Sequence, residues 1–374
     1  MPPTLYVVTP VDSFILKVNP RFYKSRGHYI LSNLYKQQII HYHKREVMLL
    51  VTLKDVAELA EVSVTTVSRM LNNKGNVSIK TQDKINAAMR ELGYFPNDMA
   101  RSLTVKTSNF IGLIVPSVES FFFASVVEHV EISAAAKGFK LLLCVTGNDS
   151  KKERDYYKML MCNRVAGIIQ CNLSPKVEKH VHPDSPVVVF ERTPSLAIPS
   201  VVADNYGGGK MAAEHLIGKG CRRPIYISAK MSSEADGNKR EDGFRDAFQE
   251  HGLPAPIAVN ASWKDRFSSQ LDKTIQEIFS AYPNIDSIAS NDVVAAAIVK
   301  YCLRNGIRIP EDLKIIGYDN TPFASLCAIP LTTIHQPIKE MCAYAIDVII
   351  KRAAGQVVPL QTVLPVHLVE RQTT

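Results

Sequence analysis

Apolar positions along the chain follow two patterns, which meet near residue 108. Between Thr52 and Leu92 they recur every three or four residues, and this period predicts three short helices. From Phe110 onwards, short apolar runs alternate with longer amphipathic stretches. Such alternation predicts parallel strands that are covered by helices on both faces. The roughly 265 residues of this part exceed one comfortable hydrophobic core, so we expect two sheets with a cleft between them.

The segment from Thr52 to Gly93 carries local signals for helix ends. Thr52, Ser63 and Ser78 are the expected N-caps of its three helices, because their side-chain oxygens can accept a hydrogen bond from a free backbone amide. Gly93 is the expected stop of the third helix. A tight turn at Glu61-Val62 separates the first two helices. Two helices joined by such a turn form a helix-turn-helix.

The larger part of the chain is predicted to alternate between strands and helices. The expected strands span residues 110–115, 140–145, 167–170, 187–190, 224–228, 287–289 and 314–317. The expected helices span residues 124–137, 151–161, 209–219, 239–251, 271–282, 293–305 and 338–354. Ligands in folds of this class bind at the carboxyl ends of the strands, which is where we expect a binding cleft.

Composition excludes several classes of protein. Hydrophobic residues make up 46% of the chain and charged residues 21%, as in ordinary folded proteins. No stretch approaches the ~18 consecutive apolar residues of a membrane helix, and the first twenty residues lack the basic start of a secretory signal. The seven cysteines form no CxxC pair, which argues against a disulfide framework or a zinc site. We expect a cytoplasmic protein without a membrane segment, metal or cofactor.

The net charge of +8 is concentrated at the N-terminal end. Residues 1–47 contribute +5, residues 48–107 contribute +2 and the remainder contributes +1. A basic end on a neutral body suits nucleic-acid binding, although a solvated basic tail would give the same balance. Residues 1–47 lack a sustained apolar period, and a clean pattern begins at Met48. This extension is either a flexible or partner-binding segment, or it comes from an upstream start and the native chain begins at Met48.

A series of motifs runs in order from Met48 to the C-terminus. They are Thr52–Ala60, Val62-Ser63, Thr66–Asn72, Glu91–Tyr94, Pro96-Asn97, Ala100–Leu103, Ile111–Pro116, Asp204-Asn205, Ser290–Asp292, Ile316–Asn320 and Leu331–Pro337. Together they resemble the lactose and galactose repressor (LacI/GalR) family of bacterial transcriptional regulators. Any one motif would be weak, but their number and order make the resemblance specific. It does not extend to the first 47 residues.

The resemblance implies an α/β body of two parallel-sheet lobes, like the periplasmic sugar-binding proteins, with a small all-α head. The chain is then expected to cross between the lobes near Asp204-Asn205, Asp319–Thr321 and Ala354-Gly355. A homodimer is expected to bind palindromic double-stranded operator DNA. The implied parts are the extension at 1–47, a helix-turn-helix DNA-binding domain at 48–95, a hinge helix and linker at 96–108, and an effector-binding and dimerisation domain at 109–374.

The resemblance also implies which residues contact DNA. Val64, Thr65 and Arg69 match base-reading positions on the second helix, which lies in the major groove. Arg69 can bond a guanine bidentately, and Val64 can contact a thymine methyl. Leu103 of the hinge helix is the candidate wedge between bases in the minor groove. The expected DNA-binding residues are Thr52, Ser63, Val64, Thr65, Thr66, Ser68, Arg69, Asn72, Tyr94, Asn97, Ala100, Arg101 and Leu103.

One position in the turn departs from the family pattern. Relatives often carry Gly or Asn where this chain has Glu61. If the turn needs a positive φ, a glutamate costs about 1 kcal/mol there. Its negative charge would also lie near the DNA phosphates. We therefore expect a lower affinity for DNA than is usual in the family.

The effector site implied by the resemblance suits a polyhydroxylated ligand. Carboxylates and a guanidinium can bond hydroxyls in pairs, and Trp263, the only tryptophan, matches a position that stacks on a sugar ring. Glu191 replaces an aspartate of many relatives, and Glu234 and Asp236 replace the Arg and Thr of purine-responsive ones. Arg240→Ala is expected to fold and bind operator, yet fail to release it. The expected effector-binding residues are Phe122, Phe123, Glu191, Arg240, Trp263, Asn291 and Asp319.

These observations predict a sequence-specific transcriptional regulator. The most specific hypothesis is a repressor of carbohydrate-utilisation genes that is controlled by a small sugar or sugar phosphate. A sugar-binding protein of a transport system would share the body, but it would need a signal peptide and would lack the helix-turn-helix. An α/β sugar-processing enzyme would need a catalytic constellation, and none is found in the sequence. Activation stays an open alternative, because the position of the operator decides between activation and repression. Dependence on a corepressor stays open as well.

Overall fold

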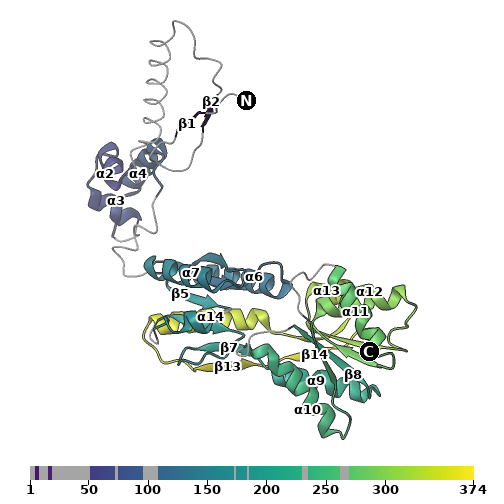
Figure 1. Ribbon diagram of the computed structural model, residues 1–374. Coiled ribbons are helices and arrows are strands. Elements are labelled where there is room, and N and C mark those ends of the chain that lie inside the picture. The colour runs from purple at the N-terminus through teal and green to yellow at the C-terminus, as the bar shows by residue number, and fades with distance from the viewer. Residues whose placement is uncertain are drawn as a thin grey trace, which may run out of the picture. The chain divides into compact units, whose positions relative to one another are not determined.

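A computed structural model describes residues 5–7, 16–18, 51–71, 75–95, 108–171, 174–182, 185–229, 235–261 and 269–374. The chain divides into two compact units, Met1–Asn97 and Asp98–Thr374 (Figure 1). Six of the predicted site residues lie outside the described residues: Asn72, Asn97, Ala100, Arg101, Leu103 and Trp263.

Three helices form the core of the first unit. They are α2 (Leu53–Leu59), α3 (Val64–Leu71) and α4 (Ile79–Leu92), which confirms the three predicted helices. In the same unit, β1 (Leu5–Val7) pairs antiparallel with β2 (Leu16–Val18). The two helices of the motif, α2 and α3, pack against each other, and α4 packs against α2. The buried apolar side chains of this unit are Val56, Ala57, Ala60, Val67, Ile85 and Ala88.

The predicted helix caps are present in the first unit. Thr52 and Asp55 form a capping box, in which the Thr52 amide donates to Asp55 Oδ2 at 2.7 Å and the Asp55 amide donates to Thr52 Oγ1 at 3.4 Å. Ser63 and Ser78 each accept a hydrogen bond from the amide three residues later, at 3.1 and 3.2 Å. Gly93 ends α4 with a φ of 61°. These local contacts satisfy backbone groups that helix ends leave free.

The second unit contains two lobes, each built on a six-stranded sheet. The strands of the first lobe are β3 (Phe110–Val115), β4 (Lys140–Val145), β5 (Gly167–Gln170), β6 (Val187–Phe190), β7 (Ser200–Ala203) and β13 (Gln361–Leu364). Their order is β13-β7-β6-β5-β3-β4, and all neighbouring strands are parallel. The apolar runs predicted four of these strands, but not β7 or β13.

The sheet of the second lobe is parallel except at one edge. Its strands are β8 (Pro224–Ala229), β9 (Ile257–Ala261), β10 (Ser287–Ala289), β11 (Lys314–Asp319), β12 (Thr332–His335) and β14 (His367–Val369). Their order is β14-β12-β11-β10-β8-β9, and β14 runs antiparallel to β12. Of these strands, β8, β10 and β11 were predicted. The mainly parallel two-lobed architecture confirms the predicted fold class.

Helices cover both faces of both sheets. They are α6 (Phe121–Ala136), α7 (Ser150–Cys162), α8 (Pro175–Glu178), α9 (Asn205–Gly218), the 3-10 helix η2 (Asp236–Asn238), α10 (Lys239–Glu250), α11 (Ser269–Ala281), α12 (Asp292–Arg304), α13 (Pro322–Leu326) and α14 (Ile338–Ala353). In the first lobe α6 and α14 pack together on one face, and α7 and α8 cover the other. In the second lobe α9 and α10 lie opposite α11, α12 and α13 (Figure 1). No helix among the described residues is both long and apolar enough to cross a membrane.

The chain crosses between the lobes three times, and two crossings correct the sequence prediction. The first follows β7 at Asp204-Asn205, as predicted. The second follows β12 at Gln336-Pro337, and not at 319–321, because β11 and β12 are neighbours in one sheet. The third follows β13 at Pro365-Val366, and not at 354-355, because α14 and β13 both belong to the first lobe. Asp319 therefore lies inside the second lobe, at the carboxyl end of β11.

Two glycines bring the first turns of α9 and α10 close together. A Cβ on Gly209 would lie 1.9 Å from the backbone oxygen of Arg240, and one on Gly243 would lie 2.0 Å from the backbone oxygen of Tyr206. No larger residue fits at either place without a shift of backbone. This contact fixes Arg240 beside the point where the chain enters the second lobe.

Candidate DNA-binding surface and effector site

The second helix of the helix-turn-helix, α3, exposes the side chains that were predicted to read bases. Val67 is fully buried and holds the inner face of α3 against the core. Val64 is 44% exposed, and Thr65 and Arg69 are exposed as well. Among the other predicted DNA-binding residues that the structure describes, Thr52 and Ser63 are exposed, whereas Thr66, Ser68 and Tyr94 are half-buried. The structure therefore leaves the predicted reading face of α3 open to a ligand.

The turn before α3 holds Glu61 in the left-handed region of backbone conformation, with a φ of 54°. This is the strained conformation that the sequence comparison anticipated. The Glu61 carboxylate forms an ion pair with Lys84 Nζ of α4 at 3.3 Å, and both side chains are mostly exposed. An exposed pair of this kind contributes at most about 1 kcal/mol. At Glu61 the backbone strain therefore lowers the stability of the first unit, and the ion pair with Lys84 raises it.

Replacing Glu61 by glycine should stabilise the first unit relative to alanine at the same position. Both substitutions remove the ion pair with Lys84, but only glycine relieves the positive φ of 54°. We expect the free energy of unfolding of the Glu61→Gly variant to be about 1 kcal/mol higher than that of the Glu61→Ala variant. Urea unfolding of the full chain, followed by helical circular dichroism, measures the difference. Equal stabilities would show that the turn is not strained.

Arg240 is the centre of a polar cluster in the second unit. Its Nε donates to Asn205 Oδ1 at 2.6 Å, and its guanidinium carbon lies 3.8 Å from the ring centroid of Tyr318. One terminal nitrogen lies 3.7 Å from Glu191 Oε2 and the other lies 3.6 Å from Asp319 Oδ1. The Arg240 side chain is only 15% exposed. Because Glu191 follows β6 and Asp319 ends β11, the guanidinium connects the two lobes.

Glu191 is held rigidly in the first lobe. Its Oε1 accepts a hydrogen bond from the Ala203 amide at 2.6 Å, and its Oε2 accepts one from Asn205 Nδ2 at 3.0 Å. Burial raises the pKa of Glu191, and the charge of Arg240 together with these two hydrogen bonds partly offsets that effect. The backbone φ of Glu191 is 54°, an unusual value for a residue with a side chain. The site thus keeps a carboxylate in place at a conformational cost.

Asp236 brings a further carboxylate to the cluster. Its Oδ2 accepts a hydrogen bond from Asn205 Nδ2 at 2.9 Å, and its Oδ1 accepts one from Thr193 Oγ1 at 3.2 Å. Lys239 forms an ion pair with the same carboxylate. Asp236 is 3% exposed, whereas the Lys239 side chain is about half exposed. Asn205 therefore links two buried carboxylates to Arg240.

On the other side of Arg240, Asp319 is linked to a hydrogen-bond network inside the second lobe. Gln336 Nε2 donates to Asp319 Oδ1 at 2.6 Å. Asp292, fully buried at the start of α12, accepts hydrogen bonds from the Thr321 amide at 2.6 Å, Thr321 Oγ1 at 3.0 Å and Thr333 Oγ1 at 2.6 Å. Burial and the nearby charge of Asp319 raise the pKa of Asp292 to about 7. The network ties α12 to the ends of β11 and β12.

The chain matches known proteins along almost its whole length after residue 51. Residues 52–97 match the model of bacterial regulatory proteins of the lacI family, and residues 213–374 match the periplasmic binding protein-like domain. The sucrose operon repressor of Streptococcus mutans is 38% identical over 321 residues, which are 86% of this chain and 98% of that relative. The chain belongs to the lacI family of bacterial regulatory proteins.

Further comparisons agree with the lacI family. The ribose operon repressor of Halalkalibacterium halodurans is 36% identical over 327 residues, covering 86% of this chain and 97% of the relative. The crystal structure of the lac repressor dimer bound to operator and an anti-inducer matches with a TM-score of 0.77 at 27% identity. That match covers 86% of this chain and 98% of the other. The resemblance seen in the sequence is therefore confirmed, and the chain is a transcriptional regulator with a DNA-binding head.

Three other residues predicted for the effector site, Phe122, Phe123 and Asn291, make structural contacts within their own lobes. Phe122 and Phe123 are half-buried at the start of α6, where they pack against the apolar core with their rings 5.1 Å apart and nearly perpendicular. Asn291 caps α12, because its Oδ1 accepts a hydrogen bond from the Val294 amide at 3.1 Å. The structure thus brings together Glu191 and Arg240 with Asp319, and it leaves the other described candidates outside their hydrogen-bonded cluster.

The cluster includes four residues that were not predicted as site residues: Asn205, Asp236, Tyr318 and Gln336. Three of them, Asn205, Tyr318 and Gln336, belong to family motifs that the sequence analysis quoted, so the motifs could have suggested them. Asp236 was considered only as evidence against a purine ligand. Asp236 joins the cluster through a hydrogen bond from Asn205. Because Asn205 lies 31 positions earlier in the chain, no local sequence pattern indicates this contact.

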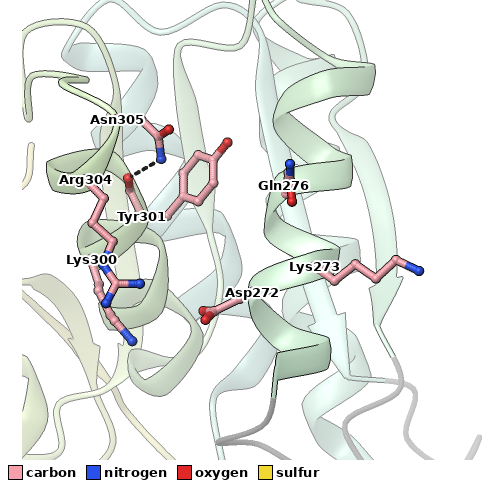
Figure 2. Close-up of a pocket in the computed structure, with 7 residues that line it drawn as sticks. All are labelled: Asp272, Lys273, Gln276, Lys300, Tyr301, Arg304 and Asn305. Atoms are coloured by element: carbon pink, nitrogen blue, oxygen red, sulfur yellow. Dashed lines mark hydrogen bonds between the residues drawn. The ribbon is translucent and has the colours of Figure 1, made fainter.

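A separate open pocket lies between α11 and α12 (Figure 2). It has a volume of about 410 Å³. Figure 2 shows Asp272 of α11 pointing toward α12, where Asn305 donates to the Tyr301 backbone oxygen at 2.9 Å. None of the predicted effector residues that the structure describes lines this pocket. Its lining residues are Asp272, Lys273, Gln276, Lys300, Tyr301, Arg304 and Asn305.

Proposed function

We propose that this lacI-family chain represses carbohydrate-utilisation genes in the cytoplasm. A homodimer binds a palindromic operator, and a small sugar or sugar phosphate controls that binding. The names of the relatives, sucrose and ribose operon repressors, support the carbohydrate assignment. The observation that carries the control by a ligand is Arg240, which pairs with a carboxylate from each lobe. A ligand that displaces Glu191 or Asp319 from Arg240 breaks an ion pair between the lobes. It thereby changes the relative position of the lobes and the conformation of the hinge.

In this proposal the domains keep the roles assigned from the sequence. Residues 48–95 bind DNA, residues 96–108 form the hinge and residues 109–374 bind effector and dimerise. Val64, Thr65 and Arg69 read bases, while Ser63, Thr66 and Ser68 hold phosphates. The chain performs no catalysis. Support comes from the relatives, which are named as repressors and not as enzymes.

The sequence left other functions open, and each has its own test. A transport protein would bind sugar without binding DNA. An activator would bind its DNA site and raise transcription, and a corepressor-dependent regulator would need the ligand in order to bind. The relatives' names favour repression. An operator-binding titration with and without sugars and sugar phosphates, together with a reporter gene, separates all four cases.

Replacing Arg69 by alanine should lower affinity for the operator by about 1–3 kcal/mol per half-site and relax preference at one base pair. The reason is that a bidentate contact to guanine has no substitute. Binding to operator and to random DNA is measured at one salt concentration, because phosphate contacts vary with salt. Arg90→Ala is the control, since Arg90 is an exposed arginine of the same unit outside the reading positions. Equal losses on operator and random DNA would make Arg69 a phosphate contact.

A further inference from the structure

Two of the three crossings between the lobes are flanked by histidines that face each other. His335 ends β12, directly before the crossing at Gln336-Pro337, and His367 begins β14, directly after the crossing at Pro365-Val366. The two residues are partners in the antiparallel ladder, and the centroids of their rings lie 4.6 Å apart. Both rings therefore lie where the chain passes from one lobe to the other.

A chain of hydrogen bonds selects one protonation state of His335. Arg371 Nη2 donates to Asn320 Oδ1 at 2.7 Å, and Asn320 Nδ2 lies 3.1 Å from His335 Nδ1. Because a guanidinium only donates hydrogen bonds, the oxygen of the Asn320 amide has to face Arg371. The amide nitrogen, which also only donates, then faces His335, so Nδ1 of the ring is the acceptor. Only the neutral ring, without a proton on Nδ1, fits this chain.

The groups around His335 act on its charge in opposite directions. Burial and the neighbouring His367 hold the pKa of His335 below its ordinary value of 6.5, whereas the charge of Glu340 on α14 raises it. On β11, the ladder partner Asp319 has its carboxylate beside Arg240. The second lobe therefore favours the neutral ring, and Glu340 of the first lobe favours the protonated one.

The helix α9 also packs against β12 and β14, but its charged and titratable groups bond other partners or face solvent. The protonation of His335 is therefore governed by groups at the crossings. The groups of α9 are Lys210, which pairs with Glu250, Lys219, which pairs with Glu370, His215, which bonds Thr374, and the exposed Glu214.

Protonation of His335 breaks the chain of hydrogen bonds. A proton on Nδ1 would meet the N–H of Asn320, so the amide has to turn and present its oxygen to the ring. The amide nitrogen would then face Arg371, which cannot accept a hydrogen bond. The charged ring is also attracted by the Glu340 carboxylate. Protonation therefore weakens a contact inside the second lobe and favours one with the first lobe.

The position of His335 is coupled to the ion pairs between the lobes. Gln336, the next residue, is fully buried and donates to Asp319 Oδ1 at 2.6 Å. Asp319 in turn pairs with Arg240, whose other partner, Glu191, belongs to the first lobe. A displacement of the His335 ring therefore acts, through the residue that follows it, on the contact that joins the lobes.

We propose that His335 makes operator binding sensitive to pH by changing its partner across the crossing at Gln336-Pro337. The neutral ring accepts a hydrogen bond from Asn320 in the second lobe, and the protonated ring pairs with Glu340 in the first. The relative position of the lobes, and with it the affinity for DNA, then depends on the proton. This proposal goes beyond control by a sugar, because it adds a second signal and holds for any effector.

Titration of the histidine rings of the full chain, followed by nuclear magnetic resonance, tests the hydrogen-bond chain. The signal of His335 is the one that His335→Asn removes, and it should take up its proton at lower pH than histidine in the urea-unfolded chain. Asn320→Asp supplies a carboxylate that can accept from both Arg371 and a protonated ring, so His335 should bind its proton about tenfold more tightly in this variant. Titration of His335 as in the unfolded chain, or no change in Asn320→Asp, would overturn the proposal.

Binding to a palindromic operator, selected from random DNA by the full chain, tests the regulatory role without an effector. Between pH 7.5 and pH 5, at one salt concentration, the affinity of the parent chain should change about fivefold or more relative to that of His335→Asn. The asparagine oxygen can accept from Asn320 but takes up no proton, so both chains should bind equally at pH 7.5. His180→Asn, at an exposed histidine of the first lobe, is the control and should follow the parent chain.

The same pH dependence in the parent chain and in His335→Asn would contradict the proposal. A second variant covers the case in which His335→Asn does not fold. Glu340→Gln removes the partner of the protonated ring, so the change in operator affinity should move to lower pH. A change that stays at the same pH in Glu340→Gln would equally contradict the proposal.

Discussion

Arg240→Ala should lower the free energy of unfolding of the second unit by about 3 kcal/mol or more at pH 7. The substitution leaves Glu191 and Asp319 as buried carboxylates without their shared counter-charge, and breaking a buried pair by removing one partner typically costs about 3–5 kcal/mol. This changes the expectation from sequence, which treated Arg240 as a ligand contact whose loss leaves folding intact. Urea unfolding followed by the fluorescence of Trp263, the only tryptophan, measures the effect.

Two further variants separate a structural role of Arg240 from a general effect of losing an arginine. Arg245→Ala, on the same helix, removes a side chain that is 43% exposed and pairs with Asp242 and Asp246, and should cost less than about 1 kcal/mol. Adding Glu191→Gln to Arg240→Ala should recover about 1 kcal/mol or more, since it removes one of the unpaired charges. Equal losses for both arginines, with no recovery, would contradict the assignment.

Asp292 should make the stability of the second unit fall as the pH rises from about 4 to about 7. Burial, together with the charge of Asp319, raises its pKa from 3.8 to about 7. A carboxyl group with a raised pKa binds its proton more tightly in the folded chain, so the folded state is favoured while the proton is bound. That advantage is full below the pKa of the unfolded chain and is lost as the pH rises through the pKa of the folded one. A tenfold difference in proton affinity between the two states corresponds to about 1.4 kcal/mol of stability.

Asp292→Asn isolates this contribution. The asparagine oxygen can accept from the amide and the hydroxyl of Thr321, and its amide can donate to the Thr333 oxygen, although the Thr333 hydroxyl loses the acceptor it has in the parent chain. That loss does not vary with pH. Between pH 5 and pH 8 the variant should gain at least about 1.4 kcal/mol of stability relative to the parent chain. Asp272→Asn, an exposed carboxylate on α11, is the control and should show a constant difference. A constant difference for Asp292→Asn as well would contradict the prediction.

Local features of the structure followed directly from the sequence. The caps at Thr52, Ser63 and Ser78 depend on side chains that bond amides within three residues, so neighbouring positions suffice to predict them. The strands β3 and β6 are continuous apolar runs because helices bury both of their faces. The order of motifs also identified the lacI family, and the match to a relative covers 86% of the chain.

Only the tertiary structure decided how the lobes connect and which residues surround Arg240. The strands β7 and β13 were not predicted, and their pairing joins segments some 160 positions apart. The crossings at Gln336-Pro337 and Pro365-Val366 depend on which sheet each strand enters, which no local pattern states. Sequence alone determined the helix-turn-helix, the alternating strands and the family. The charge balance at Arg240 required the fold, because its partners come from distant segments and their burial sets the strength of their charges.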